Sequence, residues 1–443
     1  MKIYFIGIGG IGVSALAQYY FSKGHEVSGS DLAASETTDF LKNLPLRADK
    51  RIKINIGQKA ENIKPDIDLV VYSPAVKSDN LEYKKAKKLG IKMQSYPQAL
   101  GELTKQYFTV AVAGAHGKST TTAIIALVLI KAGLDPTVIV GTKVKEFGGG
   151  NFRNGKGRFL VIEACEYDSS FLHYSPNIIV ITNIDKEHLD YFKSFANVKK
   201  AFKNFIMRLP ADGFLVFNGD DKNLSVIARS AAIKQSPRLR LFRFARNDNE
   251  TKKIKKIIKV PGQHNVSNAL ATLQASRILK IPDKTIFKAL SEFKGTWRRF
   301  EEKKAKVNGK KIIVISDYAH HPNEISATLK AAREKYLNKK ILCVFQPHQR
   351  QRTHYLFLDF VKVFRLAPVD NIIITDIYDV AGREEKGISR KINSQKLVEK
   401  IHRKSIFYCA TNEIESFVKK NIKEIDVLII MGAGDIYKLA DRF

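Results

Sequence analysis

Two glycine-rich loops in this sequence have residue types and spacings that bind phosphate groups. The first is FIGIGGIGVSAL (residues 5–16), in which Gly7, Gly9 and Gly12 spell G-x-G-x-x-G directly after an apolar run. The second is AGAHGKSTTTA (residues 113–123). Glycines let consecutive backbone N–H groups converge on anionic oxygens at the start of a helix. We therefore expect two separate phosphate-binding sites in one chain.

The first loop, taken alone, favours a nicotinamide-dependent dehydrogenase. Its glycine spacing between a strand and a helix is typical of dinucleotide-binding folds. Asp31 lies 19 residues after Gly12, where such folds place the acid that binds the ribose. This interpretation leaves the second loop unexplained.

The second loop contains most of the parts of an ATP-binding loop. Gly114 and Gly117 supply the turn, Lys118 is expected to bridge the outer phosphates, and the Ser119 hydroxyl is expected to bind Mg²⁺. Val112 occupies the first glycine position of G-x-x-x-x-G-K-[ST], so the match is imperfect. A strand before the loop and a helix after it favour a nucleotide site, and the alternative is a tight strand-to-helix turn without a ligand.

A carboxylate and an imidazole follow the next two expected strands. Glu163 ends one strand and His188 lies 25 residues later, just beyond the other. The carboxyl ends of parallel strands face the ligand crevice, so this pair could hold a divalent cation beside the phosphates. Each residue taken alone is more typical of a solvated side chain than of a metal ligand.

The elements that must position these residues follow an α/β pattern, in which apolar strand-like runs alternate with helical periodicity. The pattern predicts three units, at residues 1–105, 106–297 and 298–443. Helices are expected at about 12–24, 119–132, 264–279, 322–337 and 353–366. Strands are expected at 2–9, 25–31, 67–76, 107–114, 158–164, 177–184, 311–318, 340–348, 371–378, 405–410 and 426–435.

The chain is strongly basic, with 75 Lys and Arg against 44 Asp and Glu, a formal net charge of +31. This charge raises the hypothesis of nucleic-acid binding. The lysines, however, are spread through every expected helix, and no basic stripe is interleaved with aromatic residues. We therefore expect solvated basic faces, an attraction for anionic small substrates and no nucleic-acid partner.

Membrane and secreted classes are not favoured. No apolar run approaches the roughly 18 residues of a membrane span, and glycines interrupt the first ten residues where a signal peptide would be apolar. Cys165, Cys343 and Cys409 show no C-x-x-C spacing and are expected to be buried free thiols. We expect a cytoplasmic protein without a membrane partner.

An ordered series of motifs resembles the Mur ligases of peptidoglycan synthesis. The resemblance implies a Rossmann-like N-terminal domain for a UDP-sugar, a central P-loop ATPase domain and a Rossmann-like C-terminal domain for an amino acid. It therefore reassigns the first glycine loop to the diphosphate of a UDP-sugar. The motifs, in chain order, are GIGGIGVSALA, AGAHGKSTTTA, EACEYDSSFL, TNIDKEHLD, VPGQHNVSNALA, WRRFE, DYAHHPNEI, FQPHQRQRT and GAGDI.

The resemblance implies an ATP-dependent amide-bond ligase that joins L-alanine to UDP-N-acetylmuramate through an acyl phosphate, as part of cell-wall synthesis. ATP and Mg²⁺ are the implied cofactors, and a monomer or homodimer is expected. A related alternative is the recycling ligase that adds a whole tripeptide to the same sugar, but HHPNEI and DSSFL resemble the alanine-adding members better. The alternatives from other classes are a nicotinamide-dependent dehydrogenase and a basic nucleic-acid-binding NTPase.

The resemblance also implies a role for individual residues. Lys118, Glu163, His188, His320 and Arg352 are the implied catalytic residues, and Ser119, Glu163 and His188 the implied metal ligands. The residues implied for the UDP-sugar are Gly7, Gly9, Gly10, Gly12, Asp31 and Ser73. Those implied for the amino acid are Tyr318, His320, His348 and Arg352. Those implied for ATP are Gly114, Ala115, His116, Gly117, Lys118, Ser119, Thr120, Asn183, His264, Asn265, Asn268 and Arg299, with Arg298 as an alternative to Arg299 for binding a phosphate.

Several positions depart from the family pattern. Ala115 and Ser119 stand where threonine is common, and the serine keeps the hydroxyl. Cys165 replaces an aspartate, which is expected to thin the acidic shell near Glu163. The other departures are Ala319 in place of a glycine and Gln349 in place of an arginine.

Overall fold

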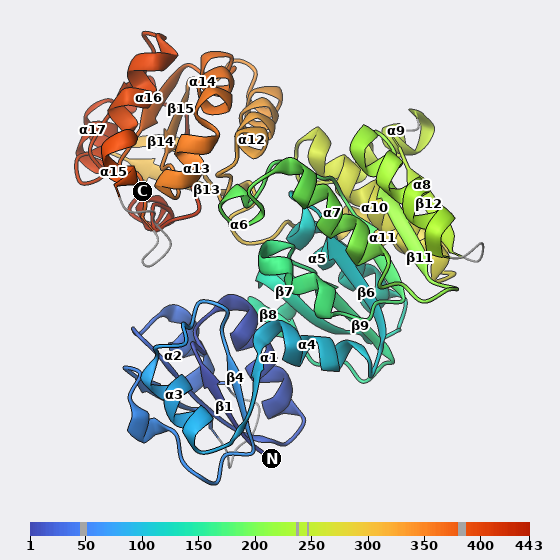
Figure 1. Cartoon of the computed structure of the whole chain (residues 1–443). Coiled ribbons are helices and arrows are strands. Elements are labelled where there is room, and N and C mark those ends of the chain that lie inside the picture. Colours follow the sequence, from blue (N-terminus) through green and yellow to red (C-terminus); the bar gives the residue numbers. More distant parts are fainter. Residues whose placement is uncertain (45–50, 236–238, 246–247, 380–386) are drawn as a thin grey trace. The chain divides into compact units, whose positions relative to one another are not determined.

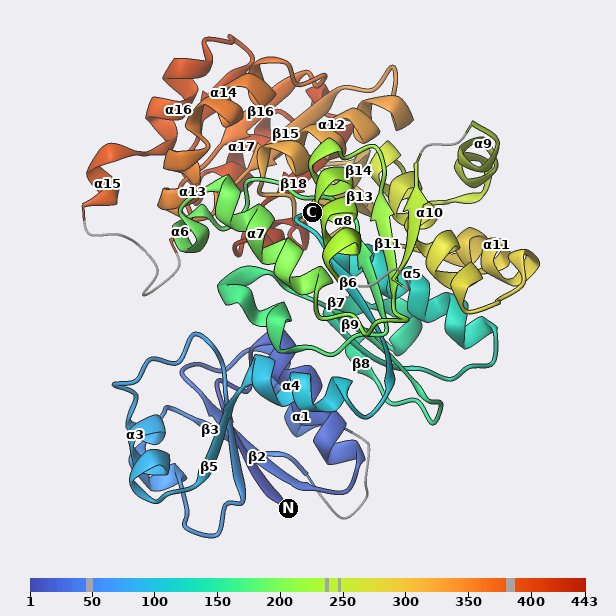
Figure 2. The same ribbon diagram turned by 45° about the vertical axis from the view of Figure 1, so that its right-hand side comes forward.

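The structure is a computed structural model, and it describes residues 1–44, 51–235, 239–245, 248–379 and 387–443. Three β-sheets with helices around them make up the chain (Figures 1 and 2). The predicted α/β class with three sheets is confirmed. None of the helices described is long and apolar enough to cross a membrane.

The first sheet is fully parallel, in the order β3-β2-β1-β4-β5. The strand order reverses beside β1, and in open α/β sheets ligands bind at such switch points. The first glycine loop follows β1 directly. The elements are β1 (Lys2–Ile6), α1 (Ile11–Ser22), β2 (Glu26–Asp31), α2 (Glu36–Lys42), β3 (Lys53–Ile56), η1 (Ala60–Asn62), β4 (Leu69–Tyr72), α3 (Leu81–Lys88), β5 (Lys92–Ser95) and α4 (Tyr96–Thr104).

The second sheet has the order β12-β11-β10-β6-β9-β7-β8, and β8 is antiparallel to β7. Helices cover both faces of parallel sheets, so inner strands such as β10 are apolar and buried along their whole length. The second glycine loop follows the central strand β6. The elements are β6 (Phe108–Ala113), α5 (Lys118–Lys131), β7 (Thr137–Val144), η2 (Lys145–Phe147), β8 (Gly150–Arg153), β9 (Phe159–Glu163), η3 (Tyr167–His173), β10 (Ile178–Ile181), α6 (Leu189–Phe192), α7 (Phe195–Ile206), β11 (Phe214–Asn218), α8 (Lys222–Gln235), β12 (Arg240–Phe244), α9 (Asp248–Ile257), α10 (Gln263–Ile278) and α11 (Asp283–Glu292).

The third sheet has the order β13-β14-β18-β15-β16-β17, with β13 antiparallel to β14. Apolar side chains from its two faces form two separate buried clusters, which is the pattern of a sheet covered on both sides. The elements are β13 (Glu301–Val307), β14 (Lys310–Asp317), α12 (Pro322–Lys335), β15 (Ile341–Phe345), α13 (Arg350–Tyr355), α14 (Phe357–Arg365), β16 (Asn371–Ile374), α15 (Ile388–Lys391), α16 (Ser394–Ile401), β17 (Ile406–Tyr408), α17 (Ile414–Lys420), η4 (Ile422–Glu424), β18 (Val427–Met431) and α18 (Tyr437–Ala440).

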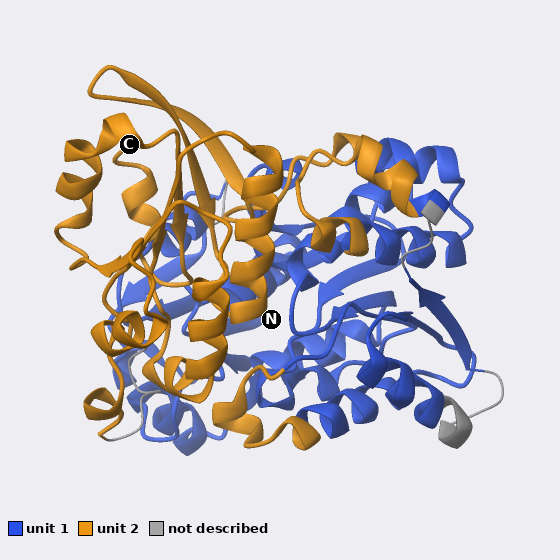
Figure 3. Cartoon of the chain, turned by 90° about the horizontal axis from the view of Figure 1, so that it is seen from above, with its two compact units in different colours: residues 1–185, 198–250, 268–290 blue, residues 186–197, 251–267, 291–443 orange. Residues whose placement is uncertain are grey.

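By its packing the chain divides into two compact units (Figure 3). Unit 1 contains residues 1–185, 198–250 and 268–290, which include the first and second sheets. Unit 2 contains residues 186–197, 251–267 and 291–443, which include the third sheet. Within unit 1, α1 packs against β7 and β8, and the side-chain amide of Gln18 donates to that of Asn151 at 2.9 Å. The boundaries 1–105, 106–297 and 298–443 remain a proposal.

Candidate active site

The second glycine loop turns from β6 into α5, and two of its glycines adopt left-handed backbone conformations. Gly114 has φ +133° and Gly117 has φ +85°. A Cβ atom on Gly114 would lie 2.1 Å from Oγ1 of Thr182, and one on Gly117 would lie 2.4 Å from Oδ1 of Asn268. Both conformation and space therefore require glycine here. The loop leads into the N-terminus of a 14-residue helix, a position that favours anions.

Residues at the end of β10 hold this loop in place. The backbone carbonyl of Asn183 accepts from Ala115 N–H at 3.1 Å, and its side-chain oxygen accepts from His116 N–H at 3.0 Å. The Asn183 amide and the Thr182 hydroxyl both donate to the His116 carbonyl, at 2.9 and 2.6 Å. Asn183, which the sequence places in the ATP site, therefore lies against the phosphate loop.

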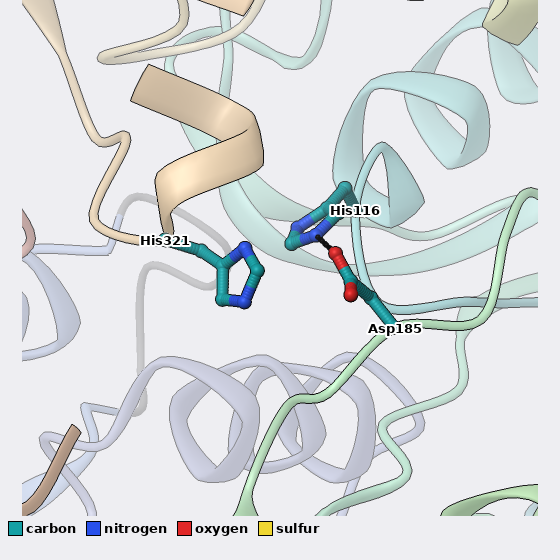
Figure 4. Close-up of side chains that lie close together, drawn as sticks. All are labelled: His116, Asp185 and His321. Atoms are coloured by element: carbon teal, nitrogen blue, oxygen red, sulfur yellow. Dashed lines mark hydrogen bonds and ion pairs between the residues drawn. The ribbon is translucent and has the colours of Figure 1, made fainter. Parts of the chain in front are cut away.

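The side chain of His116 has a carboxylate partner that the sequence analysis did not identify. Its Nε2 lies 2.9 Å from Oδ2 of Asp185 (Figure 4). Asp185 comes two residues after Asn183, so its place just beyond a strand end was the available signal. The imidazole is thereby fixed in orientation at the loop.

The ammonium group of Lys118 turns back onto its own loop and onto a buried carboxylate. Its Nζ donates to the Gly114 carbonyl at 2.6 Å and the Ala115 carbonyl at 3.1 Å, and it lies 3.2 and 3.1 Å from the two oxygens of Glu166. Burial alone would lower the pKa of Lys118, but nearby carboxylates, Glu166 above all, raise it above its ordinary value. Lys118 is thus held as a cation, and the sequence analysis did not identify Glu166.

Glu163 is the last residue of β9, and its side chain lies beside Gly141 of the neighbouring strand β7. Its Oε2 accepts from Gly141 N–H at 2.9 Å, and a Cβ atom on Gly141 would lie 2.8 Å from that oxygen. Among the described residues, no hydrogen bond is made to Oε1. A carboxylate oxygen together with the Ser119 hydroxyl is a donor set that suits Mg²⁺. These residues fit the implied cation.

Cys165 stands between the two glutamates and stays a neutral thiol. It is partly exposed, whereas Cys343 and Cys409 are buried, and all three are free. Burial raises the pKa of Cys165 to about 12, with a further contribution from Glu166. The expectation of three buried thiols is therefore wrong for Cys165. Because the thiol is neutral, Glu163 and Glu166 supply the negative charge of this segment.

The three polar residues predicted at the start of α10 are divided between the two units. Asn268 belongs to unit 1, where its side chain lies against Gly117 of the phosphate loop. His264 and Asn265 belong to unit 2, where the Asn265 amide donates to the Pro261 carbonyl at 2.7 Å.

The first glycine loop is closed by Asp31. Its Oδ2 accepts from Gly9 N–H at 2.8 Å, and its Oδ1 accepts from Leu32 N–H at 2.8 Å. A Cβ atom on Gly9 would lie 2.8 Å from the same Oδ2. Asp31 therefore contacts the loop backbone. The N–H groups of Gly7 and Ile8 both donate to Ser30.

Two further glycines of this loop allow close approach by neighbouring chain segments. Gly7 has φ +80°, and a Cβ atom there would lie 3.0 Å from Cβ of Ser73 at the end of β4. One on Gly12 would lie 2.7 Å from Cζ of Tyr96. Ser73 and Tyr96 thus flank the loop, and Tyr96 was not predicted as a site residue. Burial raises the pKa of Tyr96 above its ordinary value.

In unit 2, Arg352 is paired with a buried carboxylate. Its Nε lies 3.3 Å from Oε1 of Glu187, and its Nη1 donates to Nδ1 and to the carbonyl of His348, both at 3.1 Å. Burial alone would raise the pKa of Glu187, but Arg352, with smaller contributions from His188 and other histidines, lowers it well below its ordinary range. The sequence analysis predicted Arg352 and His188 but missed Glu187 between them.

A small cleft opens at this ion pair. Its empty volume is about 280 Å³. Residues 186–190 line one side, and Gln349, Arg352, Tyr355 and Leu356 line the other. His188, at the N-terminus of α6, therefore shares a cleft with Arg352 and Gln349.

The aromatic residues of the predicted amino-acid site gather in unit 2. His320 stands edge-on to Tyr318, with ring centroids 5.3 Å apart, and to His348, 6.1 Å away; His348 stacks on Tyr378. His320 Nδ1 lies 3.1 Å from the Tyr318 carbonyl and 3.3 Å from the Glu324 carboxylate. Burial lowers the pKa of His320 to about 4. The neutral ring thus carries its proton on Nδ1 and leaves Nε2 as an acceptor.

Two family departures can be interpreted structurally. Ala319 is buried, its N–H donates to Asp317 at 2.8 Å, and its φ is not positive, so alanine fits without backbone strain. Gln349 precedes α13 with φ +69°. Its side chain borders the cleft beside Arg352.

The structure distinguishes the two arginines proposed as phosphate clamps. Arg298 is 3% exposed, lies over the rings of Trp297, Tyr318 and Tyr437, and donates to the carbonyls of Gly432 and Gly434. It therefore serves the packing of unit 2, which leaves Arg299 as the better placed of the two arginines for a phosphate.

Arg299 has a side chain that is 29% exposed and lies 3.3 Å from Glu324. Its guanidinium therefore remains a candidate for binding a phosphate of ATP.

The comparisons with known proteins agree with this arrangement along the whole chain. Models of the Mur ligase family match residues 2–108 (catalytic domain), 112–276 (middle domain) and 298–434 (glutamate ligase domain). The chain belongs to the Mur ligase family.

Among its curated relatives, a UDP-N-acetylmuramate–L-alanine ligase of Clostridium botulinum is 41% identical over 460 residues, covering 100% of this chain and 97% of that protein. One from Caldanaerobacter subterraneus is 40% identical over 469 residues, with the same coverage.

Solved structures of Mur ligases resemble this one. The UDP-N-acetylmuramate–alanine ligase of Thermotoga maritima has a TM-score of 0.79 at 28% identity, covering 100% of this chain and 98% of that one. A murein peptide ligase of Psychrobacter arcticus has a TM-score of 0.71 at 22% identity, with the same coverage, and shows that the fold is shared.

Proposed function

We propose that this Mur ligase joins L-alanine to UDP-N-acetylmuramate at the expense of ATP. The observation that carries the proposal is full-length similarity to ligases of that name, at 41% identity, in a chain whose phosphate loop is built at the start of α5. The product is a precursor of peptidoglycan. We place the reaction in the cytoplasm.

The first step activates the carboxylate of the sugar. A carboxylate oxygen attacks the γ-phosphorus of ATP, the bond to the bridging oxygen breaks, and ADP leaves an acyl phosphate behind. Such transfers need alignment and charge neutralisation more than covalent help. Lys118 and the N–H groups at the start of α5 supply donors for the phosphates, and Asn183, which accepts from the N–H groups of Ala115 and His116, keeps the loop in shape. Mg²⁺ held by Ser119 and Glu163 would neutralise phosphate charge, and His188 would hold a second Mg²⁺.

The second step forms the amide bond. The neutral amine of alanine attacks the acyl carbon, and inorganic phosphate leaves. The Arg352 guanidinium is placed to bind the alanine carboxylate, because charge-assisted bonds of this kind are strong. His320, neutral near pH 7, offers Nε2 to the amine, while His348 and Tyr318 shape the pocket.

The UDP-sugar is assigned to the first glycine loop. Gly7, Gly9, Gly10 and Gly12 form the turn from β1 into the N-terminus of α1, a position that favours a diphosphate, and Ser73 just after β4 flanks them. Asp31 already accepts from Gly9 N–H, so its role there is to hold the loop. A dehydrogenase would use this loop alone, and the similarity to ligases over the entire chain argues against it.

A recycling ligase for a whole tripeptide is the second candidate within the family. Its structural relative from Psychrobacter arcticus is only 22% identical, so that likeness supports the fold alone. The 41% identity over the full chain to alanine-adding ligases favours the single amino acid over the tripeptide.

Phosphate release with each substrate omitted in turn tests the proposal. We expect release only when ATP, Mg²⁺, UDP-N-acetylmuramate and L-alanine are all present, with no stimulation by single-stranded nucleic acid. Turnover with the tripeptide but not with alanine would support the recycling ligase. Binding of NADH at micromolar concentration would revive the dehydrogenase.

A further inference from the structure

The ammonium group of Lys118 is fully engaged by the protein itself. An ammonium has three hydrogen-bond donors and no acceptor. In this structure two protons face the carbonyls of Gly114 and Ala115, at 2.6 and 3.1 Å, and the third faces Glu166. A lysine that is to contact the outer phosphates of ATP must give up part of this set.

Among the residues that the structure describes, Glu166 is the charged group in contact with the Lys118 ammonium. Its side chain is 1% exposed, against 13% for Lys118, and both of its oxygens lie 3.1–3.2 Å from Nζ. A buried carboxylate deprived of its cation is costly, so an anion that takes over the lysine must offset this cost. The phosphates of a nucleotide are such an anion.

We propose that Glu166 is a positioning residue that acts as an internal substitute for phosphate, holding Lys118 when the loop is empty and retaking it when the nucleotide leaves. The inference rests on the proposed function, because it assigns ATP to this loop. Glu166 competes with ADP for the lysine, so it weakens nucleotide binding and speeds the release of ADP.

The sign of this effect separates the proposal from a structural role. If Glu166 only supported the loop, removing its charge would loosen the loop and weaken nucleotide binding. If it competes for Lys118, the same change must tighten binding. Glu166→Gln keeps the shape and one oxygen acceptor but removes the charge.

Calorimetric titration of the full-length protein with ADP and Mg²⁺ tests the proposal. Because hydrogen bonds to charged groups are about twice as strong as neutral ones, we expect Glu166→Gln to bind ADP at least about fivefold more tightly than the unaltered protein. The inhibition constant of ADP in the ligase reaction should fall by a similar factor. Glu415→Gln, which removes an exposed pair with Lys419 in α17, is the matched control and should change neither value.

A double-mutant cycle checks that the effect passes through Lys118. In a Lys118→Met background, Glu166→Gln should leave ADP affinity unchanged. Glu166→Asp, which retracts the carboxylate, should tighten binding by a smaller factor and serves if the glutamine variant does not fold. Unchanged or weaker ADP binding in the folded Glu166 variants, or tightening that persists without Lys118, would overturn the inference. No binding of ADP to the unaltered protein would instead contradict the proposed function.

Discussion

At the scale of single residues, Gln349 is the departure from the family pattern that bears most directly on the alanine pocket. It borders the cleft beside Arg352, at a position where the family resemblance leads us to expect an arginine. Its backbone has φ +69° whichever side chain is present, so an arginine would add no new backbone strain. A second guanidinium there would contribute a charge-assisted bond, worth about 1.5–3 kcal/mol.

Gln349→Arg should therefore lower the Michaelis constant for L-alanine by about tenfold or more, and leave that for ATP nearly unchanged. Steady-state kinetics with each substrate varied in turn measure both. Arg352→Ala serves as the opposite case and should raise the constant for alanine. If Gln349→Arg had the same Michaelis constant for alanine as the unaltered protein, residue 349 would not contact the bound alanine.

The buried imidazole of His320 makes stability depend on pH. Its pKa is lowered from 6.5 to about 4, mainly by burial. Between these values the unfolded chain binds a proton that the folded chain does not, so folding stability falls as the pH drops from 6.5 to 4 and then levels off. The loss from this group is at most on the order of 3 kcal/mol.

His320→Gln should make folding stability depend less on pH between pH 6.5 and 4. Thermal unfolding of both proteins across pH 4–7 measures it, and groups common to both cancel in the difference. Parallel profiles would show that the ring is protonated equally in the folded and unfolded states.

At the scale of elements, the start of α5 depends on a glycine in a left-handed conformation. Gly117 and Gly133 have similar φ values, +85° and +72°, at the two ends of this helix. A Cβ atom on Gly117 would meet Asn268 at 2.4 Å, whereas one on Gly133 would meet nothing within 4 Å. The two sites therefore share the conformational cost of alanine but not the steric one.

Gly133→Ala should cost about 1–2 kcal/mol of stability and leave ADP binding intact. Gly117→Ala should cost more and weaken ADP binding by at least about tenfold, because Asn268 and the loop must move apart. Thermal unfolding and ADP titration of the two variants provide the comparison. Equal effects on ADP affinity would show that the contact with Asn268 is unimportant.

The elements that the sequence predicted are those with a strong local signal. Buried strands such as β6 and β10 are continuous apolar runs, and Gly133 follows the end of α5 as predicted. The edge strands β3 and β5 are short and partly polar, so nothing local marks them. The helix expected at 353–366 is divided near Leu356 into α13 and α14, a break set by packing.

The partners of the site residues were harder to predict than the residues themselves. Lys118 and Arg352 stand in recognisable motifs. Glu166 and Glu187 pair with them across 48 and 165 positions of the sequence, and such contacts exist only once the chain has folded. Arg298 shows the converse, because a motif position alone did not reveal that its side chain is enclosed by aromatic rings.

At the scale of the whole molecule, the residues proposed for the phosphate loop and those proposed for the alanine pocket belong to different compact units. Lys118, Ser119 and Glu163 lie in unit 1, and His320 and Arg352 lie in unit 2. The acyl phosphate forms before alanine takes part in the reaction. Substitutions in the alanine pocket should therefore leave the formation of the acyl phosphate largely unchanged.

Trapping the acyl phosphate with hydroxylamine in the absence of alanine measures that first step alone. Arg352→Ala should still form the hydroxamate of the UDP-sugar, at a rate within about threefold of the unaltered enzyme, because the alanine carboxylate takes no part in this step. Lys118→Ala should form almost none, since phosphoryl transfer depends on positioned positive charge, yet it should bind UDP-N-acetylmuramate normally at the first glycine loop. Hydroxamate formation lost in Arg352→Ala, with the protein folded, would mean that Arg352 does more than bind alanine.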